Sequence, residues 1–448
     1  MSKLLLWCSP GFGMVDMWLP VIKKLKEKNG VTVDFIFPEP SSLRLECNKS
    51  DLFNLSEKFS DKVVYRGYSG RWFVADTLIK ASKSIKFSEL DEKISRLANR
   101  LLIGRLSKYG FLRKMGKYTH LVHRHIIRIK EDIGGVEFYD INLLNNARGI
   151  LCDITVEGKI ANKELKNELV NIQKFSMNHG TGATWYMDRF DCEKIAKKRQ
   201  DTIVYTASNL ENPAYNKCFG ISDDNIINAG IPSHDNDWIE FICKRPGFSE
   251  DSTFGEFVFI IGRPASPYNT YKRKKKALVN IYNNICIKHK LKIIVKTHPK
   301  ESINGIDGDM YKDVLGIENY GKIWMYSDKH PFILGKKAVF SISFYSGVAL
   351  GLLSIKKPTI EYLDLRGIEA YDNKHSLRDK SDTPVFSDRY ANLVLGASNK
   401  LEFEKHVDSI LNRCEETVLP LYSKYKDYFD PLNNASKIVA NDIYTRIK

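Results

Sequence analysis

The sequence lacks a C-x-x-C pair, and its eight cysteines are scattered over 448 residues. Such scatter argues against a disulfide framework or a zinc site and fits a reducing compartment. The chain also lacks any apolar run of about 18 residues, and the apolar stretch at its start is too short for a signal peptide. It carries no signature of a nucleic-acid-binding module. These absences disfavour a disulfide-rich secreted protein, a membrane-spanning protein and a nucleic-acid-binding protein, and they predict a cytoplasmic location.

The length and composition indicate two globular domains. A chain of 448 residues, 43% of them apolar, exceeds the size of an ordinary single core. A polar stretch around Lys244–Glu256 that contains proline and glycine has the composition of an interdomain linker. We therefore expect an N-terminal domain over residues 1–245 and a C-terminal domain over residues 246–448, the latter ending in a helix over residues 435–448.

Strand-like and helix-like segments alternate in both halves. Short β-branched runs such as residues 31–37 and 292–297 are typical of buried strands, and helical patterns such as residues 274–289 lie between them. This alternation predicts parallel sheets covered by helices. We expect an α/β protein with two Rossmann-like, doubly wound parallel-sheet domains that face each other across a cleft.

The net charge of +15 is concentrated in one segment. Residues 71–130 contain 15 Lys and Arg against 4 Asp and Glu, and their pattern predicts amphipathic helices inserted into the N-terminal domain. Four interpretations stay open: a solvated helix face, a patch for anionic lipid, a nucleic-acid surface or a site for an anionic acceptor. Since no nucleic-acid module accompanies the segment, we expect no nucleic-acid partner and retain peripheral attachment to an anionic inner-membrane surface.

Polar residues follow the predicted strands of the C-terminal half. His298 ends the stretch KIIVKTH, and Pro299 prevents the strand from continuing. In SISFYSG a second strand ends and a helix begins, which brings together Ser343, Tyr345, Ser346 and Gly347. Because parallel sheets bind ligands at the carboxyl ends of their strands, these residues predict a cradle for a diphosphate or phosphodiester. The alternatives are a surface histidine and a plain helix cap.

Further residues lie near this expected cradle. Arg263 and Ser266 follow the first strand of the C-terminal half and are candidates for a phosphate contact. Glu361, in the predicted strand PTIEY, either accepts hydrogen bonds from a ribose or forms a salt bridge to a lysine. The run KRKKK at residues 272–276 is expected to be the solvated start of a helix.

The N-terminal half carries candidates for catalysis. His179, in NHGTG, ends a predicted strand and is either a general base or a loop histidine bonded to the backbone. Four carboxylates lie after other predicted strands: Asp153, Glu157, Asp235 and Asp237. The D-x-D triplets at Asp235–Asp237 and Asp307–Asp309 lack the context of a metal site, so we expect no metal.

The order of these motifs resembles that of the GT-B glycosyltransferases of bacterial surface polysaccharides. The motifs are NHGTG, GIPSHDND, FIIGRP, KTHPKE and SISFYSG, the last followed by KKPTIEY, and they cover about residues 150–365. The chain looks most like CMP-Kdo transferases, sialyl- and polysialyltransferases and CDP-glycerol glycerophosphotransferases. The resemblance implies that His298, Ser343 and Ser346 bind the donor phosphate and that His179 is a base. However, SFYSG lacks the aspartate and one serine of the glycerophosphotransferase motif, and the acidic pair of the sialyltransferases is missing.

The resemblance implies a metal-independent transferase that uses a nucleotide-sugar donor. We expect the C-terminal domain to bind a CMP-linked ulosonic acid, such as Kdo or a sialic-acid-like sugar. The N-terminal domain is expected to bind a glycolipid, lipopolysaccharide or polysaccharide acceptor. No cofactor besides the donor is expected, and the stereochemistry stays open. The alternatives are a CDP-glycerol or CDP-ribitol phosphotransferase, a UDP-sugar transferase or epimerase-like enzyme, and a non-catalytic nucleotide-sugar-binding subunit.

Overall fold

A computed structural model describes most of both halves of the chain. It covers residues 2–8, 12–37, 51–65, 97, 109–112, 114–115, 146–154, 172–178, 201–244, 254–266, 268–298, 301, 303, 306–368, 377–429 and 434–448. The chain divides into two compact units, the first formed by residues 1–85, 125–240 and 428–448 and the second by the remainder. Almost all of the basic segment 71–130 lies outside the described residues, so its membrane role stays a prediction.

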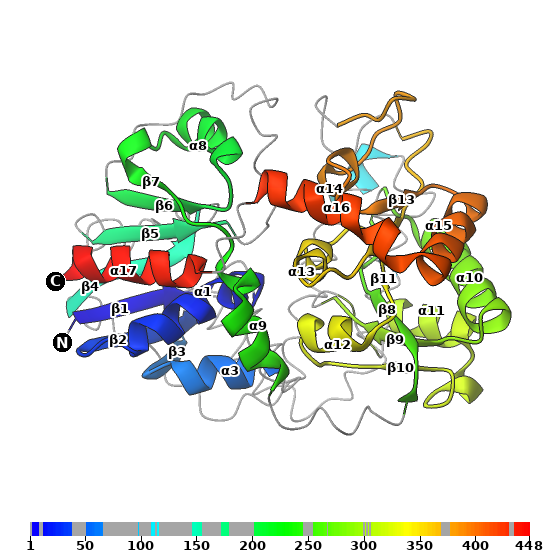
Figure 1. Cartoon of the computed structure of the whole chain (residues 1–448), viewed down its shortest axis with the longest axis horizontal. Helices are drawn as coiled ribbons and strands as arrows, with labels where there is room; N and C mark the ends of the chain where they lie inside the picture. Colours follow the sequence, from blue (N-terminus) through cyan, green and yellow to red (C-terminus); the bar gives the residue numbers. More distant parts are fainter. Residues whose placement is uncertain are drawn as a thin grey trace. The chain divides into compact units, whose positions relative to one another are not determined.

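The described part of the first unit forms a seven-stranded parallel sheet in the order β3-β2-β1-β4-β5-β6-β7 (Figure 1). Its strands are β1 (Ser2–Trp7), β2 (Val31–Phe37), β3 (Lys62–Tyr65), β4 (Ala147–Asp153), β5 (Gln173–Met177), β6 (Thr202–Thr206) and β7 (Ile226–Asn228). Its helices include α1 (Phe12–Lys26), α3 (Asp51–Phe59), α8 (Asn212–Phe219) and α17 (Ala435–Ile447), and α9 (Asn236–Cys243) contains the boundary between the units. Since β1 and β4 are neighbours, the strand order reverses between them.

The C-terminal helix α17 packs on the first unit, where it lies along α1 (Figure 1). The hydroxyl of Tyr205 donates to the Asp442 carboxylate at 2.8 Å, and the Ser2 hydroxyl donates to the Ile447 carbonyl at 3.1 Å. The expected division at residue 245 gives this helix to the second domain, whereas its contacts tie it to the first. The difference arises because the partners of α17 are distant in the sequence.

The described part of the second unit forms a six-stranded parallel sheet in the order β10-β9-β8-β11-β12-β13. Its strands are β8 (Phe257–Ile261), β9 (Lys292–Lys296), β10 (Trp324–Tyr326), β11 (Ser341–Ser343), β12 (Thr359–Tyr362) and β13 (Leu395–Ala397). Its helices are α10 (Tyr271–Tyr282), α11 (Ile306–Leu315), α12 (Pro331–Lys337), α13 (Val348–Ser354), α14 (Ser387–Tyr390), α15 (Lys400–Asn412) and α16 (Cys414–Tyr428). The predicted pair of doubly wound parallel-sheet units is confirmed.

Both faces of this second sheet are buried. Val258 and Ile260 of β8 pack in one cluster with Leu278 of α10. The alternate residue Phe259 packs in another cluster with Leu352 of α13. Burial on both faces explains why β8 is a continuous apolar run, FVFII, without polar alternation.

Two further findings bear on the expectations from composition. Among the described helices, none is long and apolar enough to cross a membrane. Cys218 in α8 is disulfide-bonded, which the scattered cysteines did not predict. The other described cysteines are free thiols: Cys8, Cys152, Cys243, Cys286 and Cys414.

Candidate functional site

The centre of the second sheet is a point where the strand order reverses. β8 and β11 are neighbours, and the chain continues from β8 to β9 and β10 on one side and from β11 to β12 and β13 on the other. Ligands of open parallel sheets bind at such a switch point, beyond the carboxyl ends of the strands. Most of the donor-binding residues predicted from the sequence follow the four central strands and therefore gather at this edge.

Ser343 ends β11 at the switch point. It is aligned with Ile261 of β8 on one side and with Glu361 of β12 on the other. Its side chain is buried, and its hydroxyl has no hydrogen-bond partner in the described structure. A buried hydroxyl without a partner costs about 1–3 kcal/mol. Ser343 thus offers a hydrogen bond that the described chain does not use.

Two of the other predicted hydroxyls serve local turns. The Ser346 hydroxyl accepts from the Val348 N–H at 3.3 Å, so it caps the first turn of α13 beside the exposed Gly347. The Ser266 hydroxyl accepts from the Asn269 N–H at 3.1 Å, and the Ser266 N–H donates to the Asn269 carbonyl at 2.9 Å. This bond agrees with the capping alternative for Ser346, although Gly347 is the N-cap residue of α13. The predicted phosphate contacts of both serines stay predictions.

Arg263 holds the main chain of Tyr345. Its guanidinium donates to the Tyr345 carbonyl and to the Tyr268 hydroxyl, both at 2.7 Å, and lies 4.9 Å from the Tyr345 ring centroid. Tyr345 has a φ of +77°, a strained conformation for a residue with a side chain, and its ring stacks on Phe386 at 3.7 Å. Arg263 therefore fixes the SFYSG turn, besides adding positive charge to the edge.

Glu361 is a buried acid whose carboxyl is influenced by the charges of two arginines. Burial raises the pKa of its carboxyl to about 7, although the charges of Arg389 and Arg263 oppose that rise. Burial also raises the pKa of the neighbouring Asp388 to about 8, and the Glu361 charge adds to the rise. The opposite charges near Glu361 are thus arginines and not the lysine considered from the sequence. Its predicted contact with a ribose stays a prediction.

His298 lies after β9 at the start of a turn that hydrogen bonds between His298 and Glu301 close. Its backbone N–H donates to Glu301 Oε2 at 2.7 Å, and the Glu301 N–H donates back to the His298 carbonyl at 2.8 Å. Glu301 is the last residue of the motif KTHPKE, and no function was assigned to it from the sequence. The half-buried His298 thus stands on a turn whose main chain is bound to a buried carboxylate.

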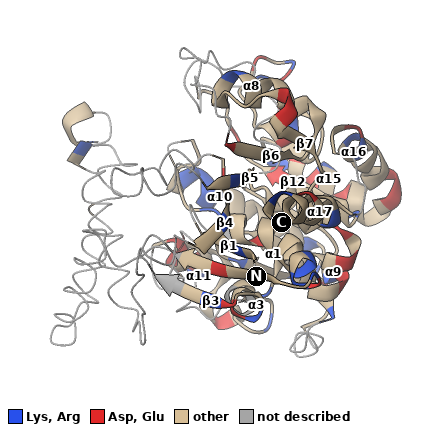
Figure 2. Ribbon diagram, turned by 90° about the vertical axis from the view of Figure 1, so that its left-hand side faces the viewer, with Lys and Arg blue, Asp and Glu red and all other residues tan. Residues whose placement is uncertain are grey.

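Lys274 supports that carboxylate. Figure 2 shows Lys and Arg at the start of α10, but Lys274 within this run is fully buried. Its ammonium lies 2.6 Å from Glu301 Oε1 and 3.3 Å from Asp307 Oδ1. The expectation of a solvated helix start is therefore wrong for Lys274. The Lys274 ammonium thus also binds the carboxylate of Asp307, one of the aspartates considered as a metal ligand.

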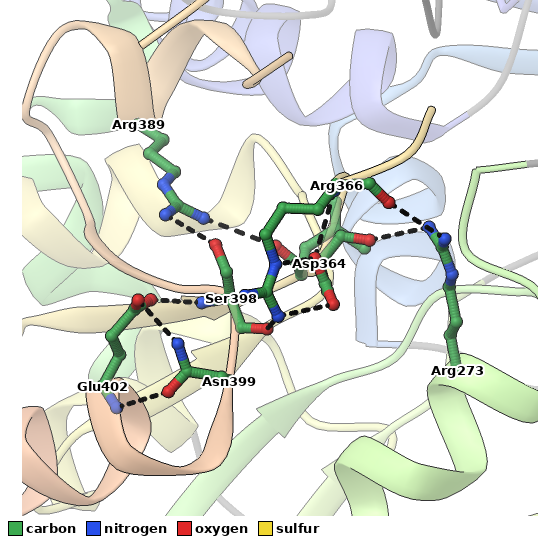
Figure 3. A network of polar contacts seen from close by, with 8 residues as sticks. Arg273, Asp364, Arg366, Arg389, Ser398, Asn399 and Glu402 are labelled. Atoms are coloured by element: carbon green, nitrogen blue, oxygen red, sulfur yellow. Dashed lines mark hydrogen bonds and ion pairs between the residues drawn. The ribbon is translucent and has the colours of Figure 1, made fainter. Parts of the chain in front are cut away.

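A polar network fastens the loop that follows β12 (Figure 3). Arg273 donates to the Asp364 carbonyl at 2.8 Å and to the Arg366 carbonyl at 3.2 Å. Arg389 donates to the Ser398 hydroxyl at 2.8 Å and to the Leu363 carbonyl at 3.4 Å. The edge of the sheet beside Glu361 is therefore held by side chains from α10 and α14.

The first unit has its own switch point between β1 and β4. Asp153 ends β4 there and is fully buried. A small pocket at the ends of β5 and β6 is lined by Asn178, Tyr205 and Glu211 among others. The predicted base His179 directly follows Asn178, but His179 and Glu157 lie outside the described residues. The catalytic roles proposed for these residues stay predictions.

The two remaining carboxylates make structural contacts. The Asp235 carboxylate accepts hydrogen bonds from the N–H groups of Ala435 at 2.9 Å and Ser436 at 2.8 Å, and from the Ser436 hydroxyl. It therefore caps α17 from 200 residues away. The exposed Asp237 pairs with Lys24 at 2.6 Å. Where the chain is described, no three His, Cys, Asp or Glu side chains form a group that could hold a metal.

Replacing Asp235 by asparagine should loosen α17. The amide keeps only one acceptor oxygen for three donors, so we expect the free energy of unfolding to fall by about 1–2 kcal/mol in urea denaturation. Asp237→Asn is the matched control, and its exposed ion pair should contribute at most about 0.5 kcal/mol. Full stability with lost turnover in Asp235→Asn would instead favour the catalytic role predicted from the sequence.

By sequence, the chain matches no protein-family profile and no curated protein. Its fold is nevertheless similar to that of many solved structures. An MnaA–UDP co-structure from S. aureus is 12% identical, with a TM-score of 0.54 and coverage of 100% of this chain and 98% of that one. The UDP-GlcNAc 2-epimerase of Methanocaldococcus jannaschii in complex with UDP-GlcNAc and UDP is 14% identical, with a TM-score of 0.52 and coverage of 99% and 100%.

A third similar structure is the wall teichoic acid polymerase TagF soaked with CDPG. It is 12% identical, with a TM-score of 0.52, and the alignment covers 100% of this chain and 88% of that one. The chain has the GT-B fold. At these identities the likeness establishes the fold and leaves the reaction open.

Proposed function

We propose that the chain is a nucleotide-sugar-dependent GT-B transferase whose second unit binds the donor. The donor we favour is a CMP-linked ulosonic acid, such as Kdo or a sialic-acid-like sugar. The acceptor is a glycolipid or polysaccharide at the inner face of the cell membrane. The motif order in the sequence supports the choice of a cytidine nucleotide, and the GT-B fold agrees with it.

The buried hydroxyl of Ser343 carries this proposal. It lies at the switch point of a parallel sheet and lacks a partner in the described structure, so a ligand oxygen there would complete its hydrogen bonding. The imidazole of His298 after β9 and the charge of Arg263 after β8 suit an anionic phosphate at the same edge. Donors already placed at this edge would stabilise the charge that develops on the leaving nucleotide.

Two other enzyme activities fit the same fold. The structure with CDPG keeps open a CDP-glycerol or CDP-ribitol phosphotransferase, and the epimerases keep open a UDP-sugar enzyme. A non-catalytic subunit that binds a nucleotide sugar would also use this edge. The nucleotide that binds separates the three classes of enzyme, because their donors differ in base or in number of phosphates. Turnover separates each enzyme from the non-catalytic subunit.

A thermal-shift screen with CMP, CDP, UMP, UDP, GDP and ADP tests the proposal. A nucleotide at 100 times its dissociation constant should stabilise the protein by about 2.7 kcal/mol. We expect CMP to give the largest shift and Ser343→Ala and His298→Ala to lose it. A preference for CDP would favour glycerol-phosphate transfer, and a preference for UDP would favour the UDP-sugar enzymes. No shift with any nucleotide would contradict the proposal.

Ser341→Ala is the matched control for Ser343→Ala. The Ser341 hydroxyl lies on the same strand but is bonded to the Thr359 hydroxyl at 2.6 Å. Its removal should therefore lower the melting temperature without changing the nucleotide shift. Ser343→Ala should abolish the nucleotide shift without lowering the melting temperature, since it removes a buried hydroxyl that has no partner in the described structure.

A further inference from the structure

Lys274 and Glu301 form an ion pair that is inaccessible to solvent. Both side chains have 0% exposure, and the ammonium lies 2.6 Å from Glu301 Oε1. The ammonium also lies 3.3 Å from Asp307 Oδ1 and 4.9 Å from the ring centroid of Tyr311, whose hydroxyl is 3.4 Å from Glu301 Oε1. Elements α10 and α11 thus enclose the pair together with the turn after β9.

Stability alone is a weak reason to keep such a pair. Removing two charges from water costs free energy that their attraction often fails to offset, and apolar residues of similar size can be as stable or more so. Burial raises the pKa of the Glu301 carboxyl, while the charge of Lys274 opposes that rise. A buried pair is better explained where its fixed geometry positions another group.

The second carboxylate oxygen of Glu301 supplies that geometry. Oε2 accepts the His298 N–H at 2.7 Å, and it lies where a side chain on Gly262 would begin, 2.2 Å from that Cβ position. The Gly262 N–H donates to the Lys296 carbonyl at 2.8 Å. The carboxylate therefore binds the turn that carries His298 while touching the end of β8 at the switch point.

We propose that the Lys274–Glu301 pair is a positioning device that orients His298 by fixing the main chain of the turn after β9. Lys274 holds Glu301 and Glu301 holds the His298 N–H, so the main chain from which the imidazole extends is fixed at the edge of the sheet where Ser343 lies. The positioning of His298 by this ion pair operates in the protein without nucleotide. Its effect on nucleotide binding rests on the proposed function.

Two double variants separate positioning from stability. Lys274→Met/Glu301→Met replaces the pair by apolar side chains and removes the acceptor of the His298 N–H. Lys274→Met/Glu301→Gln also removes both charges but keeps an acceptor oxygen. Both variants remove the two fully buried charges together and leave only the partly exposed Asp307 without its ammonium partner, so both should fold. Lys275→Met is the control on the same helix, because it removes the exposed ion pair between Lys275 and Asp313.

The first readout is the imidazole NMR signal of His298 without nucleotide, assigned with His298→Ala. We expect the signal to shift and broaden in the Met/Met variant and to match wild type in the Met/Gln variant and in Lys275→Met. An unchanged signal in the Met/Met variant would overturn the proposal. Wild type supplies a second test, because the His298 N–H should exchange with solvent about 100-fold more slowly than an open turn amide. An unprotected amide would overturn it as well.

The second readout is the dissociation constant of the nucleotide selected by the screen. We expect about tenfold weaker binding in the Met/Met variant and near-wild-type binding in the Met/Gln variant, the loss expected for one hydrogen bond to a charged group. If wild type binds no nucleotide while the His298 signal still moves, the proposed function fails and the positioning device stands. If the Met/Met variant binds as tightly as wild type, the pair has no positioning role at the site.

Discussion

Gly262→Ala should unfold or strongly destabilise the second unit. The new Cβ would lie 2.2 Å from Glu301 Oε2, 2.8 Å from the Lys296 carbonyl oxygen and 3.0 Å from the His298 nitrogen. Two of these atoms belong to the backbone, one at the end of β9 and one in the turn after it, and the third belongs to the carboxylate that Lys274 holds through its other oxygen. Because none can move freely, we expect a loss of about 3 kcal/mol in the free energy of unfolding, measured in urea. Nucleotide binding should be lost in the fraction that still folds.

A double-mutant cycle identifies the contact responsible. Lys274→Met/Glu301→Ala removes the closest of the three atoms together with the buried charge that it pairs with, so Gly262→Ala should cost less in that background than in wild type. The backbone contacts at 2.8 and 3.0 Å remain, and part of the cost should persist. An equal cost in both backgrounds would show that the carboxylate does not occupy the space beside Gly262.

The strand-end candidates could be predicted because parallel strands share one rule. The carboxyl ends of parallel strands meet at one edge of the sheet. Ser343, Glu361 and His298 therefore had to lie near one another once the strands were recognised. The short strands β3, β10 and β13 were not predicted. They have 4, 3 and 3 residues, too few to show a period, whereas the equally short β11 lies in the longer apolar run AVFSIS.

The burial of Lys274 could have been predicted from the spacing of the apolar residues in α10. Lys274 shares a face with Ala277, Leu278 and Ile281, at spacings of three, four and seven residues, and all four are buried. The surrounding lysines obscured this signal. Asp235 carried no comparable signal, because its partners Ala435 and Ser436 are 200 residues away and only the tertiary fold brings them together.

The stability of the second unit should fall as the pH rises from about 5 to 8. Burial raises the pKa of Glu361 from 4.5 to about 7 and that of Asp388 from 3.8 to about 8. A carboxyl whose pKa is raised on folding stabilises the fold while it is protonated in both states. That contribution is lost as the pH rises from the unfolded pKa through the folded one. At 1.36 kcal/mol per pKa unit, Glu361 alone corresponds to about 3 kcal/mol.

Urea denaturation of Glu361→Gln and Asp388→Asn at a series of pH values checks this expectation. Each amide resembles the protonated acid. The free energy of unfolding of each variant should therefore fall less between pH 5 and 8 than that of wild type, and each variant should be more stable than wild type at pH 8. Asp364→Asn is the matched control. Burial would raise the pKa of Asp364, but hydrogen bonds from Arg366 outweigh that effect and lower it. The stability that Asp364 contributes is lost as the pH decreases. Asp364→Asn should therefore still lose stability between pH 5 and 8, as wild type does. A wild-type profile that is flat or rises between pH 5 and 8 would contradict the raised pKa values, and for Glu361 it would mean that Arg263 and Arg389 keep the carboxyl ionised.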